Sequence, residues 1–158
     1  MFNDWIEIGA RLALSVLAGT IIGLNRDLHG KPAGVRTHSL VSLGTALAVI
    51  LVVPLHDDVA MRYDALSRVI QGVVTGIGFL GAGVIVRDAA KKHVSGLTTA
   101  AAIWFAAILG LACGAGQYVP VIMALALGLL VVLCGGPFER WFRPRGAHED
   151  DPSNPPTP

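Results

Sequence analysis

The feature that most restricts the fold of this chain is a series of five long apolar stretches, separated by short segments that carry most of the charge. They cover residues 8–24, 37–55, 69–86, 96–115 and 119–134. A helix needs roughly 17–25 apolar residues to cross a bilayer, and each stretch is about that long. Charged residues make up only 15% of the chain, well below the level of about 25% in soluble domains. We therefore predict an all-α membrane protein, a bundle of five transmembrane helices within residues 1–140, followed by a disordered cytoplasmic tail at 141–158.

The stretch GIGFLGAGVIVRD, residues 76–88, begins with a G-x-G-x-x-G match of the kind found in nucleotide-binding loops. Such a loop needs a strand before it, a helix after it and an acidic residue about 20 positions later. Here the glycines lie inside an apolar stretch, and Ala101 stands 20 positions after Gly81. Small residues four positions apart instead let two helices approach closely in lipid. The predicted packing residues, at the centre of the bundle or at a subunit interface, are Gly72, Gly76, Gly78, Gly81 and Gly83.

Lysine and arginine indicate the orientation, because short cytoplasmic loops carry an excess of both. Segments 25–36 and 87–95 hold three lysines or arginines each, and the C-terminal segment holds Arg140, Arg143 and Arg145. The turn GAGQY before the last apolar stretch carries no charge. We expect the N-terminus outside the cell and the C-terminus in the cytoplasm.

A polar cluster is predicted where the first and second apolar stretches meet, in GLNRDLHGKPAGVRTHSLV, and where the fourth stretch begins. The expected helix starts carry partial positive charge, so with the arginines they could hold an anion or a carboxylate. The simpler interpretation is that Asp27 pairs with Arg36 and that the threonines cap their helices. The candidate residues are Asn25, Arg26, Asp27, Arg36, Thr37, His38, Thr98 and Thr99.

A second polar patch consists of Arg68, Gln71 and Thr75, whose spacing puts them on one helical face toward the outside. They either hydrogen-bond to neighbouring helices or form a site, and the first interpretation is favoured. Arg11, Arg87 and Arg140 are expected to reach toward lipid headgroups from the helix ends. Cys113 and Cys134 are expected at opposite ends of neighbouring helices, too far apart for a disulfide.

No catalytic set of residues emerges, and no cofactor or metal site is predicted. The histidines are scattered, and Asp57 and Asp58 have no partner carboxylates at metal-ligand spacing. A pore that strips water from Mg²⁺ should present acids inside the membrane, where this sequence has none in pairs. No basic arm or basic helix suits nucleic acid. These observations favour a non-enzymatic membrane protein.

Three blocks of the sequence resemble the signature of the MgtC/SapB family of bacterial inner-membrane proteins. They are GLNRDLHGKPAGVRTHSLVSLGTAL, RVIQGVVTGIGFLGAGVIVRD and VSGLTTAAAIWFAAILGLACGAGQY, and the resemblance covers roughly residues 8–135. The motif positions are Arg26, Asp27, Gly34, Arg36, Thr37, Arg68, Gly76, Gly78, Gly81, Gly83, Gly96, Leu97, Thr98 and Thr99. Glutamate is usual in the family where Asp27 stands here.

The resemblance implies a role in growth at low magnesium and in virulence, through contacts with other membrane proteins such as the ATP synthase. It also implies a location in the bacterial inner membrane. Separately from the resemblance, the glycine-rich helix, if it lies at a subunit interface, leads us to expect a homodimer. Many family members carry a soluble C-terminal domain, whereas only a short tail follows Arg145 here, so we expect a short form. The alternative function is a transporter or channel for magnesium or another small ion.

Overall fold

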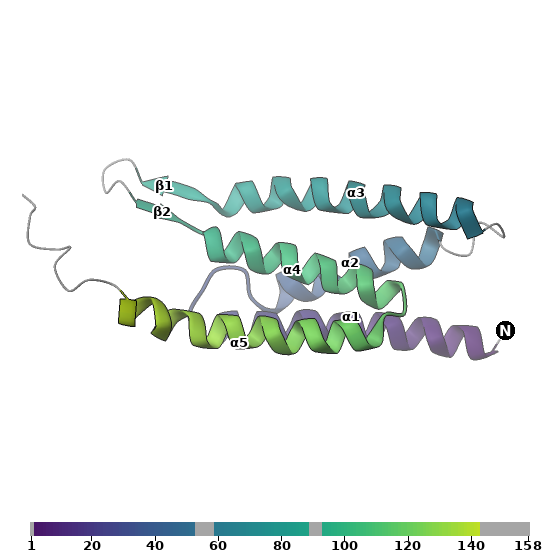
Figure 1. Ribbon diagram of the computed structural model, residues 1–158, viewed down its shortest axis with the longest axis horizontal. Helices are drawn as coiled ribbons and strands as arrows, with labels where there is room; N and C mark the ends of the chain where they lie inside the picture. Colours follow the sequence, from purple (N-terminus) through teal and green to yellow (C-terminus); the bar gives the residue numbers. More distant parts are fainter. Residues whose placement is uncertain (1, 53–58, 89–92, 143–158) are drawn as a thin grey trace, which may run out of the picture. The chain divides into compact units, whose positions relative to one another are not determined.

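The computed structural model describes residues 2–52, 59–88 and 93–142, which form five helices and one short hairpin (Figure 1). The helices are α1 (Phe2–Leu28), α2 (Val35–Val52), α3 (Val59–Val84), α4 (Leu97–Gly114) and α5 (Tyr118–Phe142). All five are long and apolar enough to cross a membrane. The prediction of an all-α membrane protein with five transmembrane helices is confirmed.

Three helices extend further than the apolar stretches that predict them. α1 begins six residues before position 8, α3 begins ten residues before position 69, and α5 ends eight residues after position 134. Arg62 and Arg68, which precede the third apolar stretch, therefore lie inside α3. The physical reason is that an apolar stretch marks the depth of the hydrocarbon, whereas backbone hydrogen bonding continues into the polar headgroup layer.

The short hairpin was not predicted. Its strands β1 (Val86–Asp88) and β2 (His93–Ser95) pair antiparallel, with Arg87 opposite Val94. Gly96 follows with a φ of 89° and approaches the last carbonyl of α3, Val84, so closely that a Cβ atom would not fit. This turn brings the start of α4 against the end of α3.

By their contacts, the residues divide into two compact units, Met1–Leu125 and Ala126–Pro158. In the first unit α1, α2 and α4 pack on one another, and α3 packs mainly on α4. The central apolar cluster includes Ala18, Ala46, Ala106, Leu109 and Val121. The described part of the second unit is the continuation of α5, whose side chains Leu127, Leu130 and Val131 are exposed.

Two glycine pairs inside the first unit bring helix backbones together. A Cβ atom on Gly19 or Gly23 of α1 would collide with the backbone of α2. A Cβ atom on Gly110 or Gly114 of α4 would collide with α2 further along that helix, at Ser42, Thr45 and Ala46. Each pair has the G-x-x-x-G spacing that favours close helix contact in lipid. Sequence reasoning missed both pairs, although the same spacing was the signal used for α3.

The glycines of α3 do not pack as the sequence suggested. Gly76 and Gly78 do lie in one continuous helix, but a Cβ atom on Gly72, Gly76, Gly78 or Gly83 would meet nothing within 4 Å. Among the five, Gly81 is buried, and its Cβ position lies 3.5 Å from the Cβ atom of Ala100. For Gly72, Gly76, Gly78 and Gly83 a central position within the described chain is therefore wrong, because α4 meets another side of the helix, through Ile77 and Gly81. The predicted subunit interface stays a prediction.

Candidate functional site

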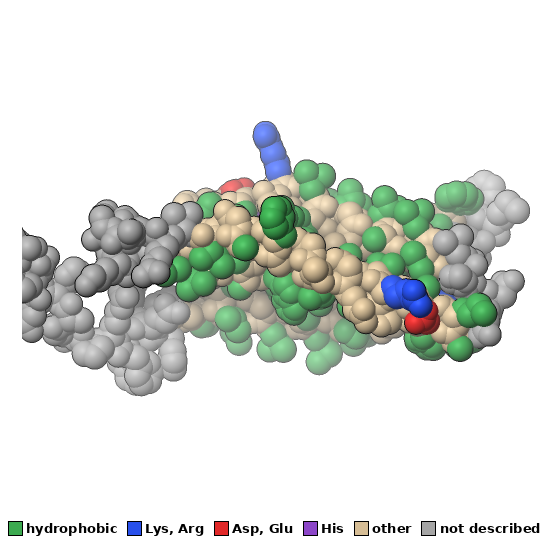
Figure 2. All heavy atoms as spheres, turned by 90° about the horizontal axis from the view of Figure 1, so that it is seen from above, with side chains coloured by type: hydrophobic (Ala, Val, Ile, Leu, Met, Phe, Trp, Pro, Cys, Tyr) green, Lys and Arg blue, Asp and Glu red, His purple; other side chains and the backbone are tan. Residues whose placement is uncertain are grey.

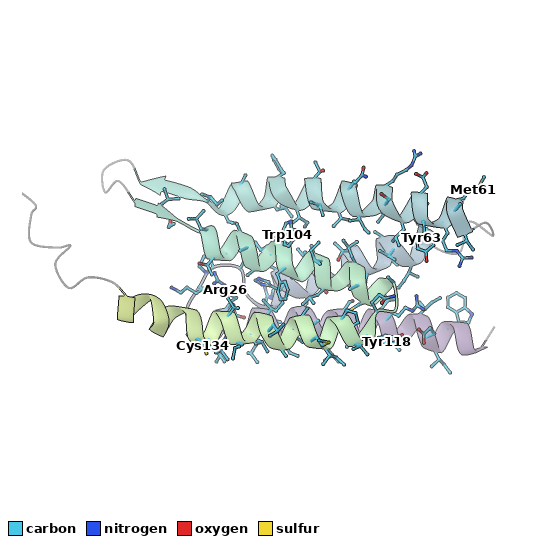
Figure 3. The ribbon with its side chains drawn as sticks, viewed as in Figure 1. Arg26, Met61, Tyr63, Trp104, Tyr118 and Cys134 are labelled. Carbon is cyan, nitrogen blue, oxygen red and sulfur yellow. The ribbon has the colours of Figure 1, made fainter. Side chains whose placement is uncertain are left out.

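The polar cluster predicted from the sequence lies largely at one end of the first unit, where α1 ends and α2 and α4 begin. We call this the Arg26 end. Figure 3 shows Arg26 there and Tyr118 at the other end of the unit. α1 stops because Gly30 adopts a φ of 60°, and the amide of Lys31 donates to the carbonyl of Arg26. This glycine-terminated helix end turns the chain toward α2.

Arg26 is the charged residue buried most deeply among those described, with only 4% of its surface exposed. Its Nη2 donates to the hydroxyl of Thr99 in the first turn of α4, which ties α1 to α4. Its Nε atom is buried and has no hydrogen-bond partner among the described residues. The guanidinium therefore lies inside the protein without a described carboxylate partner, an arrangement that is costly in a membrane.

Asp27 performs a different task from the predicted one. Its Oδ2 accepts a hydrogen bond of 3.0 Å from the amide of Val35 and so caps the start of α2. Its carboxylate lies directly against Gly34, where a Cβ atom would collide with it. Arg36 is exposed and makes no ion pair with Asp27 or with any other residue in the described ranges. The prediction of an Asp27–Arg36 pair is wrong, because a helix start offers the carboxylate a nearer donor.

His38 lies in the first turn of α2 and is fully buried. Its Nδ1 is 2.9 Å from the carbonyl of Gly34, so Nδ1 carries the proton and Nε2 presents a lone pair. Nε2 has no partner among the described residues, and neither has the buried hydroxyl of Ser42 one turn further along. The backbone of His38 meets Gly19 of α1, and Val35 meets Gly23, three residues before Arg26, so His38 and Arg26 both lie along the contact between α1 and α2.

The remaining candidates do not join this group. Thr37 and Thr98 are exposed, and Asn25 contributes its main-chain carbonyl, 2.7 Å from Nδ1 of His29. Further from the Arg26 end, hydroxyl groups also form hydrogen bonds between neighbouring helices. The hydroxyls of Thr20 and Ser39 lie 2.9 Å apart, and Thr45 donates across to the carbonyl of Ala107 over 3.0 Å. Sequence reasoning missed these residues because single hydroxyls in apolar helices carry little signal.

The second polar patch lies on the exposed surface of α3. Arg68 pairs with Asp64 at 2.9 Å, Gln71 bonds to Ser67, and Thr75 bonds to the carbonyl of Gln71. All of these contacts stay within α3. The favoured expectation of hydrogen bonds to neighbouring helices is therefore wrong for the described chain, because this side of α3 faces away from α4.

At the opposite end of the first unit, Arg11 contacts other residues of the protein, whereas the sequence predicted only that it reaches toward lipid headgroups. It donates from Nη1 to the carbonyl of Gly114 over 2.9 Å and pairs with Glu7 at 2.9 Å. Tyr118 also donates to Glu7, over 2.5 Å. Arg11 thus ties α1 to the end of α4, a contact that sequence reasoning missed. The side chains of Arg87 and Arg140 lie outside the described residues, and Cys113 and Cys134 are free thiols, the first buried and the second exposed.

Comparison with known proteins places this arrangement in a family. The model of the MgtC family matches residues 12–141. Over 123 residues the chain is 48% identical to protein SrpB of Synechococcus elongatus. The aligned residues make up 73% of this chain and 68% of SrpB. It is 40% identical over 130 residues to the putative magnesium transporter YhiD of Escherichia coli K12, covering 80% of this chain and 59% of YhiD.

Protein MgtC of Salmonella typhimurium LT2 is 36% identical over 123 residues, which amount to 78% of this chain and 48% of that protein. The chain thus spans between about half and two thirds of the length of these relatives. No solved structure matches the chain. The match over most of the five helices, together with these relatives, shows that the chain belongs to the MgtC family of multi-pass membrane proteins.

Proposed function

We propose that this protein is a non-enzymatic component of the bacterial inner membrane that serves adaptation to low magnesium by binding another membrane protein. Family membership supports the membrane setting, and the name of the relative YhiD, a putative magnesium transporter, links that protein to magnesium. A role in virulence and contact with the ATP synthase belong to the same proposal, and they depend on the family resemblance.

The observation that carries this proposal is an exposed side of α3 that suits another helix. Residues spaced three and four apart along it share one side, which we call the α3 face: Arg68, Gln71, Gly72, Thr75, Gly76, Phe79 and Gly83. All seven are exposed, Phe79 to 82%. Figure 2, which views the molecule from above relative to Figure 1, shows a surface made mostly of hydrophobic side chains (green) and of backbone and uncharged polar side chains (tan), with few charges.

The chemistry of the α3 face favours a protein neighbour over lipid. Gly72 and Gly76 repeat the spacing that Gly19–Gly23 and Gly110–Gly114 use to bring helices together within this chain. Gln71 and Thr75 lie within the apolar stretch, where polar side chains exposed to lipid are costly, and a neighbouring protein helix would cover them. The proposed occupant is a helix of another membrane protein, and a second copy of this chain is the competing occupant.

Photo-crosslinking from position 79 tests the proposal. A crosslinking amino acid that replaces Phe79 should capture one specific protein in cells grown at low magnesium, and mass spectrometry should identify it. Gly76→Leu should abolish the adduct and impair growth at low magnesium without lowering the amount of folded protein, because a Cβ atom at position 76 meets nothing within 4 Å among the described residues. Gly78→Leu is the matched control, since Gly78 is equally open but, two residues further along, lies on nearly the opposite side of the helix from Gly76.

Each alternative has its own result. An adduct of twice the chain's own mass would replace the heterologous partner by a homodimer. Lipid adducts alone, together with normal growth of Gly76→Leu, would refute binding through the α3 face.

Transport of magnesium is the second candidate, and the name of YhiD favours it. The charge buried at the Arg26 end argues against magnesium transport, because it belongs to Arg26, a cation. A path for Mg²⁺ needs oxygen ligands, carboxylates above all, and the described residues contain no group of three His, Cys, Asp or Glu side chains that could hold a metal. Magnesium uptake into liposomes that contain the purified protein would establish transport in place of the first proposal.

A further inference from the structure

At the Arg26 end, the described residues leave a buried positive charge without a negative partner. The guanidinium of Arg26 is buried, and its hydrogen bond goes to the neutral hydroxyl of Thr99. Its Nε–H group points to no acceptor among the described residues. A buried cation without an anion is strongly unfavourable, so the arrangement calls for a negative group.

The neighbouring helix start adds to this positive charge. Thr99 belongs to the first turn of α4, where N–H groups have no partner within the helix and carry partial positive charge. Gly96 at the N-cap supplies no side-chain acceptor. The cation of Arg26 thus lies against the positive end of α4. The nearby carboxylate of Asp27 is engaged at the start of α2 and forms no ion pair with Arg26.

His38 sets a second requirement for a ligand that would supply the negative charge to Arg26. Its Nε2 lone pair is fully buried and unpartnered, while Nδ1–H is held by Gly34. A ligand that satisfies both side chains must offer anionic oxygen to Arg26 and a hydroxyl hydrogen to His38. Hydrogen phosphate has both, and so has a phosphate-bearing lipid headgroup with a free hydroxyl, such as phosphatidylglycerol.

We propose that the Arg26 end is a binding site for a phosphate group. Arg26 donates from Nε to a phosphate oxygen, the uncapped start of α4 supports the negative charge, and His38 accepts a hydrogen bond from a hydroxyl of the ligand. Arginine suits this role because its planar fork matches phosphate oxygens, and helix starts bind phosphate through their free N–H groups. The site goes beyond the proposed partner binding, which uses α3.

Thermal unfolding of the purified full chain tests the site and separates its two sources of phosphate. In detergent, inorganic phosphate is compared with chloride at equal ionic strength. In nanodiscs, phosphatidylcholine alone is compared with a mixture that contains phosphatidylglycerol. A rise in Tm of several degrees in the first comparison identifies free phosphate as the ligand, and a rise confined to the second identifies a lipid headgroup.

Variants connect the rise to the cluster. Arg26→Gln should abolish it, and His38→Phe should weaken it, whereas Arg36→Gln should retain it because Arg36 is exposed at the same end of the bundle. If Arg26→Gln does not fold, Arg26→Lys keeps the charge without the fork and should raise the half-saturating concentration. The proposal is overturned if neither comparison shows a rise, or if the Arg26 and Arg36 variants respond alike.

Discussion

Substituting Gly110 by alanine tests how closely α2 and α4 pack, and substituting Gly76 provides the matched control. Gly110 is buried, and a Cβ atom there would lie closer than 3.0 Å to the carbonyl of Ser42 and the hydroxyl of Thr45. At Gly76 the same methyl group would meet nothing within 4 Å. The two substitutions are chemically the same, so any difference between them reports the tertiary contact.

The magnitude follows from two opposing effects. Replacing glycine by alanine inside a helix stabilises by about 0.5–1 kcal/mol, because the unfolded chain loses freedom. Overpacking costs about 1–3 kcal/mol, and the upper end applies at Gly110 because part of the obstacle is backbone that cannot rotate away. We therefore expect Gly110→Ala to lower the free energy of unfolding by about 2 kcal/mol, and Gly76→Ala to raise it by about 0.5–1 kcal/mol.

Equilibrium unfolding of the monomer in mixed micelles, with rising dodecyl sulfate and helix content followed by circular dichroism, measures both values. A Gly110→Ala variant as stable as the wild type would refute the close packing of α2 on α4. Marked destabilisation by Gly76→Ala in the monomer would show instead that α3 packs through its glycines within the chain.

Three further predictions concern the charged residues Asp27, Arg36 and Arg11 and the orientation of the chain in the membrane. Asp27→Ala should lower the free energy of unfolding by about 1 kcal/mol, because α2 loses its cap, whereas Arg36→Ala should change it by less than about 0.5 kcal/mol. Equal losses of stability in the two variants would instead support an ion pair between Asp27 and Arg36. Arg11→Ala should cost about 1 kcal/mol in the same assay through the lost hydrogen bond to the end of α4, and an unchanged stability would show that this contact contributes nothing. In a cysteine-free background, an impermeant maleimide should label cysteine at Gln117 in intact cells and cysteine at Arg36 only after the membrane is opened, and the reverse pattern would invert the orientation.

The residues of the polar cluster were identifiable from the sequence, but their partners were not. Charge and hydroxyl groups beside the ends of apolar stretches single out Arg26, Asp27, His38 and Thr99. Sequence spacing suggested that Asp27 would pair with a charge. In the structure the nearer donor is the amide of Val35, and Arg26 meets a residue 73 positions away. Pairing over such a separation depends on how α1 and α4 pack, which local sequence does not encode.

By itself the sequence determined that the chain spans a membrane, because apolar stretches of this length can satisfy their backbone hydrogen bonds in lipid only as helices. It left open which helices touch. Three glycine pairs have the same spacing: Gly19–Gly23, Gly72–Gly76 and Gly110–Gly114. The first and third pack against α2, whereas Cβ atoms on the second pair would meet nothing within 4 Å among the described residues. Burial of apolar surface does not choose among them in lipid, since the tails are as apolar as the helices. Only the tertiary structure, through the complementary shapes of whole helix surfaces, decided which pair packs inside the chain and which is left exposed.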